Sequence, residues 1–245
     1  MNVVILGATR GMGRAVARQL AERGDALFLL GRDPEQLERS AADLQVRGQL
    51  EQVGRAACDL AQPETFAPAL AAAQQALGSI DAVFVTAGAF ATQAQFDGDL
   101  ELVRHVTVID YAHTVLFCEH ARRMLMEAGG GSLVVFSSVA GDRGRKPVVI
   151  YGSAKAGLSH YLESLDHAYR AQGLHTLCVK PGFVKTGMTE GLSPPPFAGE
   201  PDQVARDVLR ALDRKKPVLY TPSMWALVML VIRNLPRMIM RRINF

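Results

Sequence analysis

The sequence lacks the features that mark several common classes of protein. Three cysteines, far apart and without metal-ligand spacing, make a disulfide framework unexpected and favour a reducing compartment. A formal net charge of +3 is too small to indicate nucleic-acid binding by itself. No apolar run reaches the roughly 20 residues of a spanning helix, and the apolar start at residues 1–7 has no basic flank of a signal peptide. The six histidines form no ligand cluster, so no metal is expected. We expect a cytoplasmic protein with no nucleic-acid partner.

What the sequence does contain is an alternation of short apolar runs with longer amphipathic segments. The runs are apolar throughout, as in strands that are buried on both faces; they are Val3–Leu6, Ala26–Leu30, Val53–Cys58, Ala82–Thr86, Leu133–Ser137 and Thr176–Val179. Helices are predicted between them, at Arg14–Arg23, Pro34–Val46, Pro63–Ala76, Leu100–Glu127 and Tyr151–Ala171. Such alternation predicts an α/β fold, a doubly wound parallel sheet of the Rossmann type. We expect a single domain at residues 1–220 and an apolar, basic tail at 221–245.

A glycine cluster follows the first predicted strand directly. Gly7 suits a tight turn, Gly11 a close approach of the backbone to a pyrophosphate, and Gly13 close packing of a helix on a strand. The amino terminus of the next helix would offer oriented N–H groups to phosphates. Placed after the first strand of an alternating chain, this cluster predicts a dinucleotide site.

Two arginines bear on the choice of nucleotide. NAD-specific folds tend to carry an acidic residue about 20 residues beyond the glycines, and here Gly31 stands near that place. Arg32 follows it, and Arg10 lies within the glycine loop. Two guanidinium groups beside the adenosine ribose suit a 2′-phosphate, so NADP (as NADPH) is predicted over NAD. The alternative is that Arg32 is a solvated turn residue with Asp33 as its partner.

The strongest constellation is Ser138, Tyr151 and Lys155. A tyrosine and a lysine four apart on a helix project from one face. The lysine ammonium is expected to lower the pKa of the tyrosine, which makes Tyr151 a proton donor to a carbonyl oxygen. Ser138, at the end of the fifth strand, would hydrogen-bond the same oxygen.

Together these motifs resemble the short-chain dehydrogenase/reductase family, in its large single-domain branch, over nearly the whole chain. The resemblance implies that Asp59 contacts the adenine and that Ala87 and Gly88 line the cofactor cleft. It also implies that Val184 and Thr186 hold the nicotinamide carboxamide. The remaining cofactor contacts expected on this basis are Thr9, Met12, Leu60, Pro181 and Gly182, with Tyr151 and Lys155 beside the nicotinamide ribose.

Two positions depart from the pattern of the family. The family usually has Asn-Asn-Ala-Gly after the fourth strand, where this chain has Val85-Thr86-Ala87-Gly88. The helix asparagine that helps to hold a proton-relay water corresponds to Asp110. An aspartate can still position water, and its charge near Lys155 is expected to shift the pH optimum. We therefore count Asp110 among the catalytic candidates.

The carboxyl-terminal segment 220–242 mixes bulky apolar residues with four arginines. Trp225 and the arginines suit a membrane surface; the alternative is packing over the substrate cleft or against another subunit. This tail, with Val149–Leu158 and Lys180–Met188, is similar to the decaprenylphosphoryl keto-pentose reductases. That similarity implies a bulky or lipid-linked carbonyl substrate and a place at the inner face of the membrane. The 3-ketosphinganine reductases also resemble it in their apolar tails.

Small residues flank the catalytic pair, namely Gly152, Ser153, Ala154, Ala156 and Gly157. In this family such a helix commonly builds a subunit interface, which implies a homodimer or homotetramer. Packing within the chain is the alternative. Substrate specificity is expected to depend on three segments, Phe90–Asp99, Asp142–Val149 and the lid or binding loop Gly187–Glu200.

The sequence thus predicts an NADPH-dependent carbonyl reductase with Tyr151 as the acid. The oxidation of a secondary alcohol is the alternative within enzymes, since the same residues serve both directions. A long-chain keto-lipid is the alternative substrate. A non-catalytic NADP-binding protein is the alternative of another class, although a pure binder does not need an acid at the nicotinamide.

Overall fold

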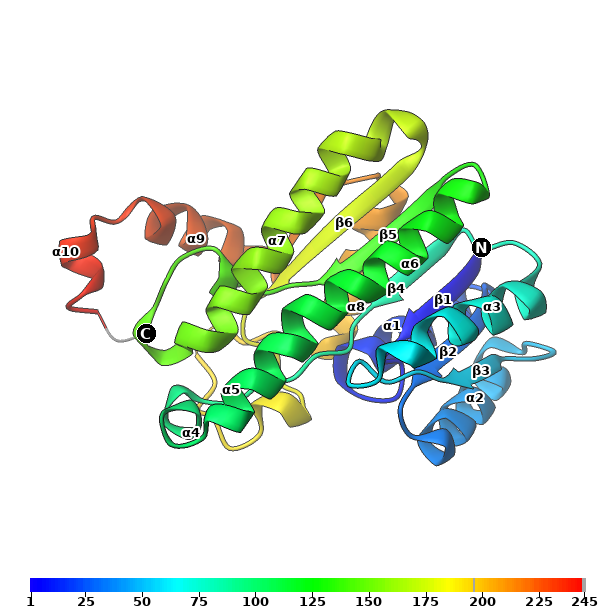
Figure 1. Ribbon diagram of the computed structural model, residues 1–245, viewed down its shortest axis with the longest axis horizontal. Coiled ribbons are helices and arrows are strands. Elements are labelled where there is room, and N and C mark those ends of the chain that lie inside the picture. The colour runs from blue at the N-terminus through cyan, green and yellow to red at the C-terminus, as the bar shows by residue number, and fades with distance from the viewer. Residues whose placement is uncertain (196, 244–245) are drawn as a thin grey trace.

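Parallel strands form the centre of the computed structural model, which describes residues 1–195 and 197–243 (Figure 1). The strands pair in the order β3-β2-β1-β4-β5-β6-β7, and each neighbouring pair is parallel. This arrangement confirms the predicted doubly wound sheet. The strands are β1 Asn2–Leu6, β2 Ala26–Gly31, β3 Gly54–Ala57, β4 Ala82–Val85, β5 Gly131–Phe136, β6 Leu174–Pro181 and β7 Val218–Thr221.

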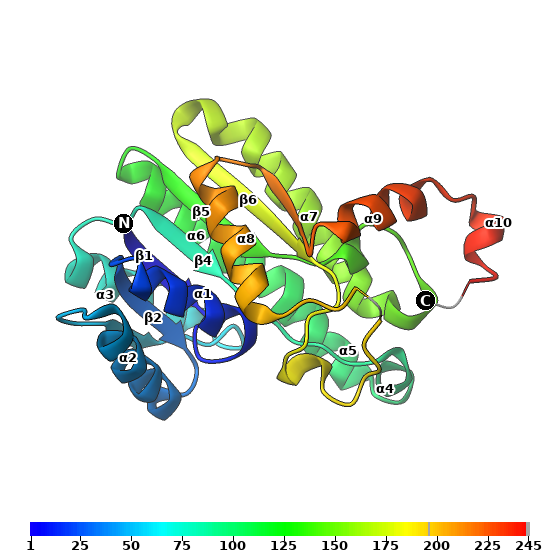
Figure 2. The same cartoon turned by 180° about the vertical axis from the view of Figure 1, so that it is seen from behind.

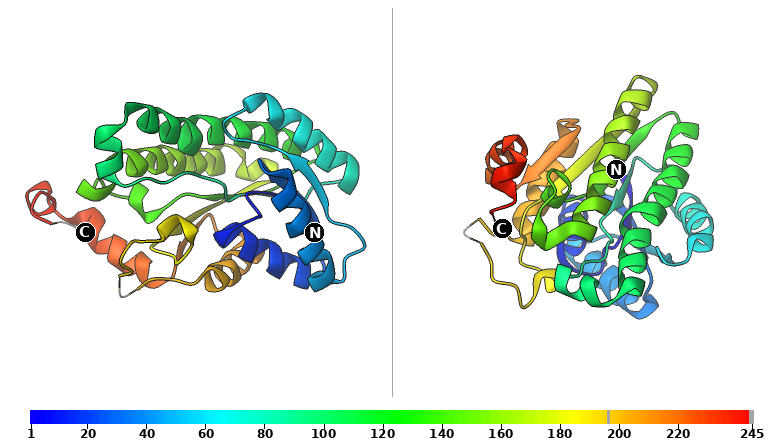
Figure 3. Two further views of the ribbon diagram at one scale, coloured as in Figure 1. Left: turned by 90° about the horizontal axis from the view of Figure 1, so that it is seen from below. Right: turned by 60° about the vertical axis from the view of Figure 1, so that its left-hand side comes forward.

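Helices cover both faces of the sheet, which explains why the strands are apolar throughout. On β1, Val3 and Ile5 pack with the helices of one face, whereas Val4 and Leu6 pack with those of the other. Figure 3 shows the resulting three layers. One face carries α3 Phe66–Leu77, α6 Thr114–Glu127 and α7 Val149–Tyr169 (Figure 1). The other carries α1 Gly11–Glu22, α2 Pro34–Gly48 and α8 Pro201–Asp213 (Figure 2).

Several elements differ from the sequence prediction, which did not include α8. The edge strand β7 was not expected either, because it is short and its first three residues are partly or largely exposed. The helix expected at Leu100–Glu127 is divided: α5 Leu100–Thr107 and α6 are joined by a π-helical turn, Val108–His113. The Thr114 hydroxyl donates to the Ile109 carbonyl, 2.6 Å away, at the end of this turn. Such turns are frequent at functional sites, and this one carries Asp110.

From β1 to β3 the chain adds strands on one side of β1, and from β4 onward it adds them on the other side. This reversal places a crevice at the carboxyl ends of β1 and β4. Leu6 pairs with Leu30 on one side and with Val85 on the other, so the loops after β1, β2 and β4 leave the sheet side by side. The loop after β5 joins them at the same edge. The fold therefore gathers the predicted motifs at one end of the sheet.

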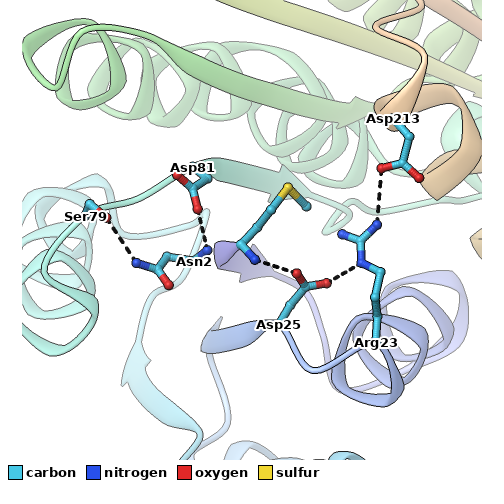
Figure 4. A network of polar contacts seen from close by, with 7 residues as sticks. Asn2, Arg23, Asp25, Ser79, Asp81 and Asp213 are labelled. Atoms are coloured by element: carbon cyan, nitrogen blue, oxygen red, sulfur yellow. Dashed lines mark hydrogen bonds and ion pairs between the residues drawn. The ribbon is translucent and has the colours of Figure 1, made fainter.

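At the opposite end of the sheet, where the strands begin, ion pairs and hydrogen bonds join neighbouring segments (Figure 4). The Asp25 carboxylate forms ion pairs with the Met1 ammonium, at 2.7 Å, and with the Arg23 guanidinium, at 2.6 Å. The Asn2 backbone N–H donates to Asp81 at 2.7 Å. These contacts join the start of β1 to the residues that precede β2 and β4, so this end of the sheet has a structural role.

The chain after β7 forms an arm that projects beyond the sheet (Figures 1 and 2). It consists of α9 Met224–Asn234 and α10 Arg237–Met240. A further short helix, α4 Gln93–Gly98, precedes α5 on the far side of the crevice.

Candidate active site

A cavity of about 690 Å³ opens at the carboxyl end of the sheet. Its walls are mainly apolar, and members of all three segments expected to control specificity line it: Phe90, Arg145 and Leu192 are examples. Ser138 and Tyr151 face the same cavity. Among residues 1–195 and 197–243, no group of three or more His, Cys, Asp or Glu side chains is arranged to hold a metal ion. The cavity thus combines an apolar body with a few hydroxyl groups.

Helix α7 places Tyr151 and Lys155 one turn apart at the inner end of the cavity. Lys155 is buried, its Nζ lies 5.6 Å from the centre of the Tyr151 ring, and it donates to the Phe136 carbonyl at 3.4 Å. The Phe90 ring meets Tyr151 edge-on at 5.0 Å between centroids. These contacts fix the tyrosine ring between an ammonium group and an apolar wall.

Ser138 lies just beyond the end of β5. Its Oγ accepts a hydrogen bond from the Ala140 backbone N–H at 3.1 Å, which orients the hydroxyl at the start of a short 3₁₀ turn. The preceding Ser137 donates to the Lys155 carbonyl at 3.0 Å, so β5 is fastened to α7 at this point. Strand and helix together place Ser138 and Tyr151 in the wall of one cavity, with Lys155 buried next to Tyr151.

The acidity of Tyr151 differs from the sequence expectation. Burial raises the pKa of the Tyr151 phenol above its ordinary value of 10.0 and outweighs the lowering effect of the Lys155 ammonium. The Asp110 carboxylate adds to the rise. The expectation took account of the lysine but not of the desolvation of the ring, and the net direction is therefore upward.

Asp110 is fully buried beside Lys155. Its Oδ1 accepts a hydrogen bond from the Ala89 backbone N–H at 2.7 Å, and its Oδ2 lies 3.8 Å from Lys155 Nζ. No group in the described part of the chain donates a hydrogen bond to Oδ2. Burial raises the pKa of Asp110, although Lys155 opposes the rise. Burial lowers the pKa of Lys155, but the charge of Asp110 and the phenol of Tyr151 more than offset it, so that this pKa is raised.

The loops after β1 and β4 are pressed together at the crevice. Gly7 adopts a φ of +98°, and a Cβ at this position would lie 2.6 Å from the Ala87 nitrogen, so only glycine fits. The Thr86 hydroxyl donates to the carbonyls of Leu6 and Gly7, at 3.0 and 3.1 Å. The threonine that replaces the family's asparagine thus fastens the glycine turn. Gly88 lies against Asp110 and Lys155, which joins this loop to the predicted catalytic group.

The two arginines of the predicted nucleotide site lie apart from the cavity, on the β2 side. Arg10 and Arg32 are exposed, and Arg10 Nε donates to Gln36 Oε1 at 2.9 Å. Asp33 accepts from the Gln36 backbone N–H at 3.1 Å and so caps α2. No ion pair joins Arg32 to Asp33 in the part of the chain that the structure describes. Arg32 is exposed in the bend after β2, as the alternative of a solvated turn residue expected, but the described residues do not pair it with Asp33.

The other predicted cofactor residues are distributed around the crevice. Asp59 follows β3, and its Oδ1 accepts from the Ala61 backbone N–H at 2.9 Å. Leu60, the next residue, is buried in the core. A Cβ on Gly11 would lie 3.4 Å from the Thr186 methyl carbon, which brings the glycine turn to the loop after β6. Six of the predicted cofactor residues line the cavity itself, namely Met12, Tyr151, Pro181, Gly182, Val184 and Thr186.

The arm packs over the carboxyl end of β6 on one side. Trp225, Met229 and Ile232 are buried against Val139 and Phe183. A Cβ on Gly182 would lie 2.1 Å from the Trp225 ring, so glycine is needed for this approach. Trp225 also lines the cavity, and the sequence pattern did not single it out for that role. Part of the tail therefore covers the cleft, as one of the two alternatives expected.

The other side of the arm is exposed and apolar. Leu227 and Leu230 are 60% exposed, Val231 57% and Met238 70%. Exposed arginines lie among them, at positions 233, 237, 241 and 242. None of the helices within residues 1–195 and 197–243 has both the length and the apolar content to cross a bilayer. The tail thus has one packed face and one open face.

The small residues of α7 have partners within the chain. A Cβ on Gly152 would lie 2.9 Å from the Ala140 carbonyl oxygen, and one on Gly157 would lie 2.9 Å from the Tyr111 ring. Packing within the chain is enough to explain both glycines.

Three relatives agree with this architecture. An uncharacterized oxidoreductase of Mycobacterium tuberculosis is 37% identical over 244 residues, which cover 98% of this chain and 96% of the relative. The cis-4-hydroxycyclohexanecarboxylate dehydrogenase of Sinomonas cyclohexanicum is 32% identical over 190 residues, 77% of this chain and 75% of its own. Carbonyl reductase family member 4 of Xenopus tropicalis is 27% identical over 217 residues, 85% and 89% of the two chains.

A solved structure of levodione reductase shares the fold, with a TM-score of 0.82 and 24% identity, over 90% of this chain and 95% of that one. The family model of the short chain dehydrogenases matches residues 1–196. These matches span the sheet, the glycine turn and the helix that carries Tyr151 and Lys155. The chain therefore belongs to the short-chain dehydrogenase/reductase family, oxidoreductases that act on alcohol and carbonyl groups with NAD(P).

Proposed function

We propose that the protein is an NADPH-dependent carbonyl reductase that acts on a bulky, lipophilic ketone. The observation that carries the proposal is that Ser138 and Tyr151 line one apolar cavity beside the glycine turn, with the buried Lys155 ammonium 5.6 Å from the centre of the Tyr151 ring. A relative named as a carbonyl reductase supports the reaction class. The apolar walls support a lipophilic substrate, which would share the volume of about 690 Å³ with the nicotinamide because predicted cofactor residues line the same cavity.

The residues of the crevice fit a dinucleotide. The first turn of α1 has no side-chain hydrogen bond capping it, so its backbone N–H groups are free to hold a pyrophosphate. Gly7 and Gly11, with positive φ, keep side chains out of this space. Thr9, Met12 and Gly13 continue the same turn. When bound, NADPH supplies the hydride that reduces the ketone.

The side chains of the cavity manage the proton. As hydride reaches the carbonyl carbon, the electron pair of the C=O double bond moves to oxygen, and Tyr151 donates its phenolic proton there. Ser138 donates a hydrogen bond to the same oxygen. Lys155 stabilises the phenolate that forms and orients the nicotinamide ribose. Asp110 is assigned to the relay that returns a proton, since its Oδ2 faces Lys155.

Replacing Tyr151 by Phe tests the reductase and the class of substrate together. NADPH oxidation is measured for both proteins with a detergent-solubilised lipid extract and with a panel of soluble ketones. We expect turnover by the wild type in the extract and a loss of about 10³-fold in Tyr151→Phe, with NADPH binding unchanged. Turnover with soluble ketones alone would contradict the lipophilic substrate. Binding without turnover in both would favour the non-catalytic alternative.

The direction of the reaction has a specific alternative. The relative from Sinomonas is named as a dehydrogenase of a ring-borne secondary alcohol, and the same three side chains serve oxidation when Tyr151 accepts the proton. Initial rates of ketone reduction and of alcohol oxidation, measured with both cofactor forms present at one fixed ratio, separate the two directions. A faster oxidation under these conditions would support the dehydrogenase.

The preference for NADPH is assigned to Arg10 and Arg32, with Gly31 where NAD-binding folds carry an acidic residue. Arg32→Gln is expected to lower the ratio of kcat/KM for NADPH over NADH about tenfold, the effect of one charge-assisted hydrogen bond. Arg39→Gln, on the exposed side of α2, is the matched control and leaves the ratio unchanged. Equal ratios in both variants would remove Arg32 from the nucleotide site.

The exposed face of the arm supports a peripheral contact with an anionic membrane. Its apolar side chains would enter the interface, and its arginines would meet anionic headgroups. Truncation of the tail is a poor test because Trp225 packs in the cleft. We therefore compare Leu227→Ser/Leu230→Ser with Val46→Ser/Leu100→Ser, where the control residues lie on α2 and α5 and are even more exposed, at 82% against 60%. Only the first pair should lose flotation with phosphatidylglycerol vesicles; equal flotation would contradict the contact.

A further inference from the structure

The loop after β2 brings an acidic residue next to the glycine turn. The Gly7 backbone N–H donates to the Leu30 carbonyl at 2.9 Å, so the loops after β1 and β2 leave the sheet side by side. Asp33 is the first acidic residue after β2. A carboxylate that faced the adenosine ribose would accept hydrogen bonds from the hydroxyls of NAD and would repel the 2′-phosphate of NADP. The direction in which Asp33 is held therefore bears on the choice of nucleotide.

Gln36, in the first turn of α2, engages both oxygens of Asp33. Its backbone N–H donates to Oδ1 at 3.1 Å, and its side-chain amide donates to Oδ2. The backbone hydrogen bond, helped by that of the side chain, holds the pKa of Asp33 below its ordinary value, and the charge of Arg10 adds a smaller effect. The carboxylate is thus bound to the amino terminus of α2.

The same Gln36 side chain also holds Arg10. Its Oε1 accepts a hydrogen bond from Arg10 Nε at 2.9 Å. Arg10 is exposed, and within residues 1–195 and 197–243 it forms no ion pair with Asp33 or with any other acid. The Nη groups of the guanidinium therefore keep their donors for an anion from outside the chain.

Gln36 thus stands between two opposite charges that are close enough to attract each other. One neutral amide accepts from the base and donates to the acid. A direct ion pair between Arg10 and Asp33 would use guanidinium N–H groups that can bind phosphate in pairs, and it would offset their charge. The amide orients Arg10 without neutralising it.

We propose that Gln36 determines nucleotide specificity, because it presents Arg10 to the 2′-phosphate of NADPH and keeps the Asp33 carboxylate away from it. Gln36 acts through these two side chains and is therefore a positioning residue. This inference rests on the proposed function, in which Arg10 and Arg32 select NADPH. It adds that the selection depends on a neutral side chain that contacts both a base and an acid.

The binding of nucleotide fragments tests this role without turnover. 2′,5′-ADP represents the adenosine end of NADP, and 5′-AMP represents that of NAD. Isothermal titration calorimetry at pH 7 measures both dissociation constants for the wild type, Gln36→Met and Gln45→Met. Methionine keeps the length of glutamine but has no N–H donor and only a weak acceptor. Gln45 is the matched control: it is also half-buried on α2, and its amide donates to the Glu51 carbonyl at 3.3 Å.

We expect the wild type and Gln45→Met to bind 2′,5′-ADP at least about 100-fold more tightly than 5′-AMP, about tenfold for each of two arginines. In Gln36→Met this preference should fall about tenfold. The fall should come from weaker binding of 2′,5′-ADP alone, since a released Asp33 carboxylate repels the phosphate and accepts from ribose hydroxyls. An unchanged preference, or an equal weakening of both fragments, would overturn the proposal.

A background without the two charges shows whether Gln36 acts through them. In Arg10→Met/Asp33→Asn, the further change Gln36→Met should alter the preference by less than about twofold. A tenfold effect that persists in this background would mean that Gln36 acts on the nucleotide in another way, and the proposed positioning role would be wrong.

The wild type separates the failure of this inference from the failure of the proposed function. If the wild type prefers 2′,5′-ADP and Gln36→Met keeps that preference, the selection of NADPH stands and its assignment to Gln36 is wrong. If the wild type binds both fragments equally, the proposed preference for NADPH is itself wrong, and the role of Gln36 is overturned with it.

Discussion

Two aspartate–lysine pairs are found in the described part of the chain, one buried and one largely shielded from solvent, and they are built differently. In the first, Asp110 and Lys155 lie 3.8 Å apart and Asp110 Oδ2 accepts no hydrogen bond from a described residue. In the second, Asp142 and Lys180 lie 2.6 Å apart, and the other oxygen of Asp142 accepts from the Tyr220 hydroxyl at 2.6 Å. Only one oxygen of the Asp110 carboxylate accepts a hydrogen bond from a described residue, whereas both oxygens of Asp142 do.

The surroundings of the pairs explain the difference. The Asp142 carboxylate joins three elements: it lies in the turn after β5 and contacts Lys180 of β6 and Tyr220 of the edge strand β7. The Asp110 pair lies on a π-helical turn beside the cavity. A shielded carboxylate with both oxygens hydrogen-bonded stabilises one arrangement of the chain. A buried carboxylate with a free oxygen is able to accept a hydrogen bond or a proton during a reaction.

Replacing each lysine by Met should separate the two pairs by the largest effect. Lys155→Met is expected to lower kcat/KM about 10³-fold, because Tyr151 loses the ammonium that stabilises its phenolate. Lys180→Met should stay within about threefold of the wild type in turnover, since the ammonium of Lys180 lies over the ring of Tyr220 and not over that of Tyr151. Steady-state kinetics with the best ketone of the panel checks both. Similar losses in the two variants would abolish the distinction.

Replacing each aspartate by Asn should reverse the ranking when stability is measured. Asp142→Asn is expected to lower the free energy of unfolding by about 3 kcal/mol, because it leaves the Lys180 ammonium buried without its counter-charge. Asp110→Asn also leaves a buried ammonium, that of Lys155, without its counter-charge, but it relieves the desolvation of a carboxylate oxygen that accepts no hydrogen bond from a described residue, so it should cost less, about 1–2 kcal/mol. Urea denaturation at pH 7 measures both. A larger cost for Asp110→Asn would mean that the first pair also has a structural role.

The pH dependence of turnover sharpens the comparison further. Burial raises the pKa of Tyr151, and the charge of Asp110 raises it more. Reduction needs the protonated phenol, so activity is full below this pKa and is lost as the pH rises through it. Asp110→Asn removes the negative charge, lowers the pKa of Tyr151 and should move the alkaline limb of kcat/KM to lower pH. Asp142→Asn should leave that limb in place; an unmoved limb in Asp110→Asn would exclude Asp110 from the relay.

Much of the site was predictable because its signals are local. Gly7, Tyr151 and Lys155 each belong to a short motif whose geometry follows from a turn or from one turn of a helix. The partners of these motifs were harder to predict. The role of Thr86 in fastening the glycine turn depends on two carbonyls about 80 residues away. The net rise in the pKa of Tyr151 depends on how deeply its ring is buried, which no spacing reveals.

The sequence by itself determined most of the alternation of strands and helices up to β6, the glycine turn after β1 and the tyrosine–lysine spacing on α7, since apolar periodicity and glycine positions act over a few residues. Only the tertiary structure decided that Asp110 faces Lys155 with one oxygen that accepts no hydrogen bond from a described residue, and that Trp225 packs on Gly182 and lines the cavity. It alone also brought Arg237 and Arg241 opposite Arg143. These are contacts between distant segments, and their free energies depend on burial and on packing that emerge when the whole sheet is assembled.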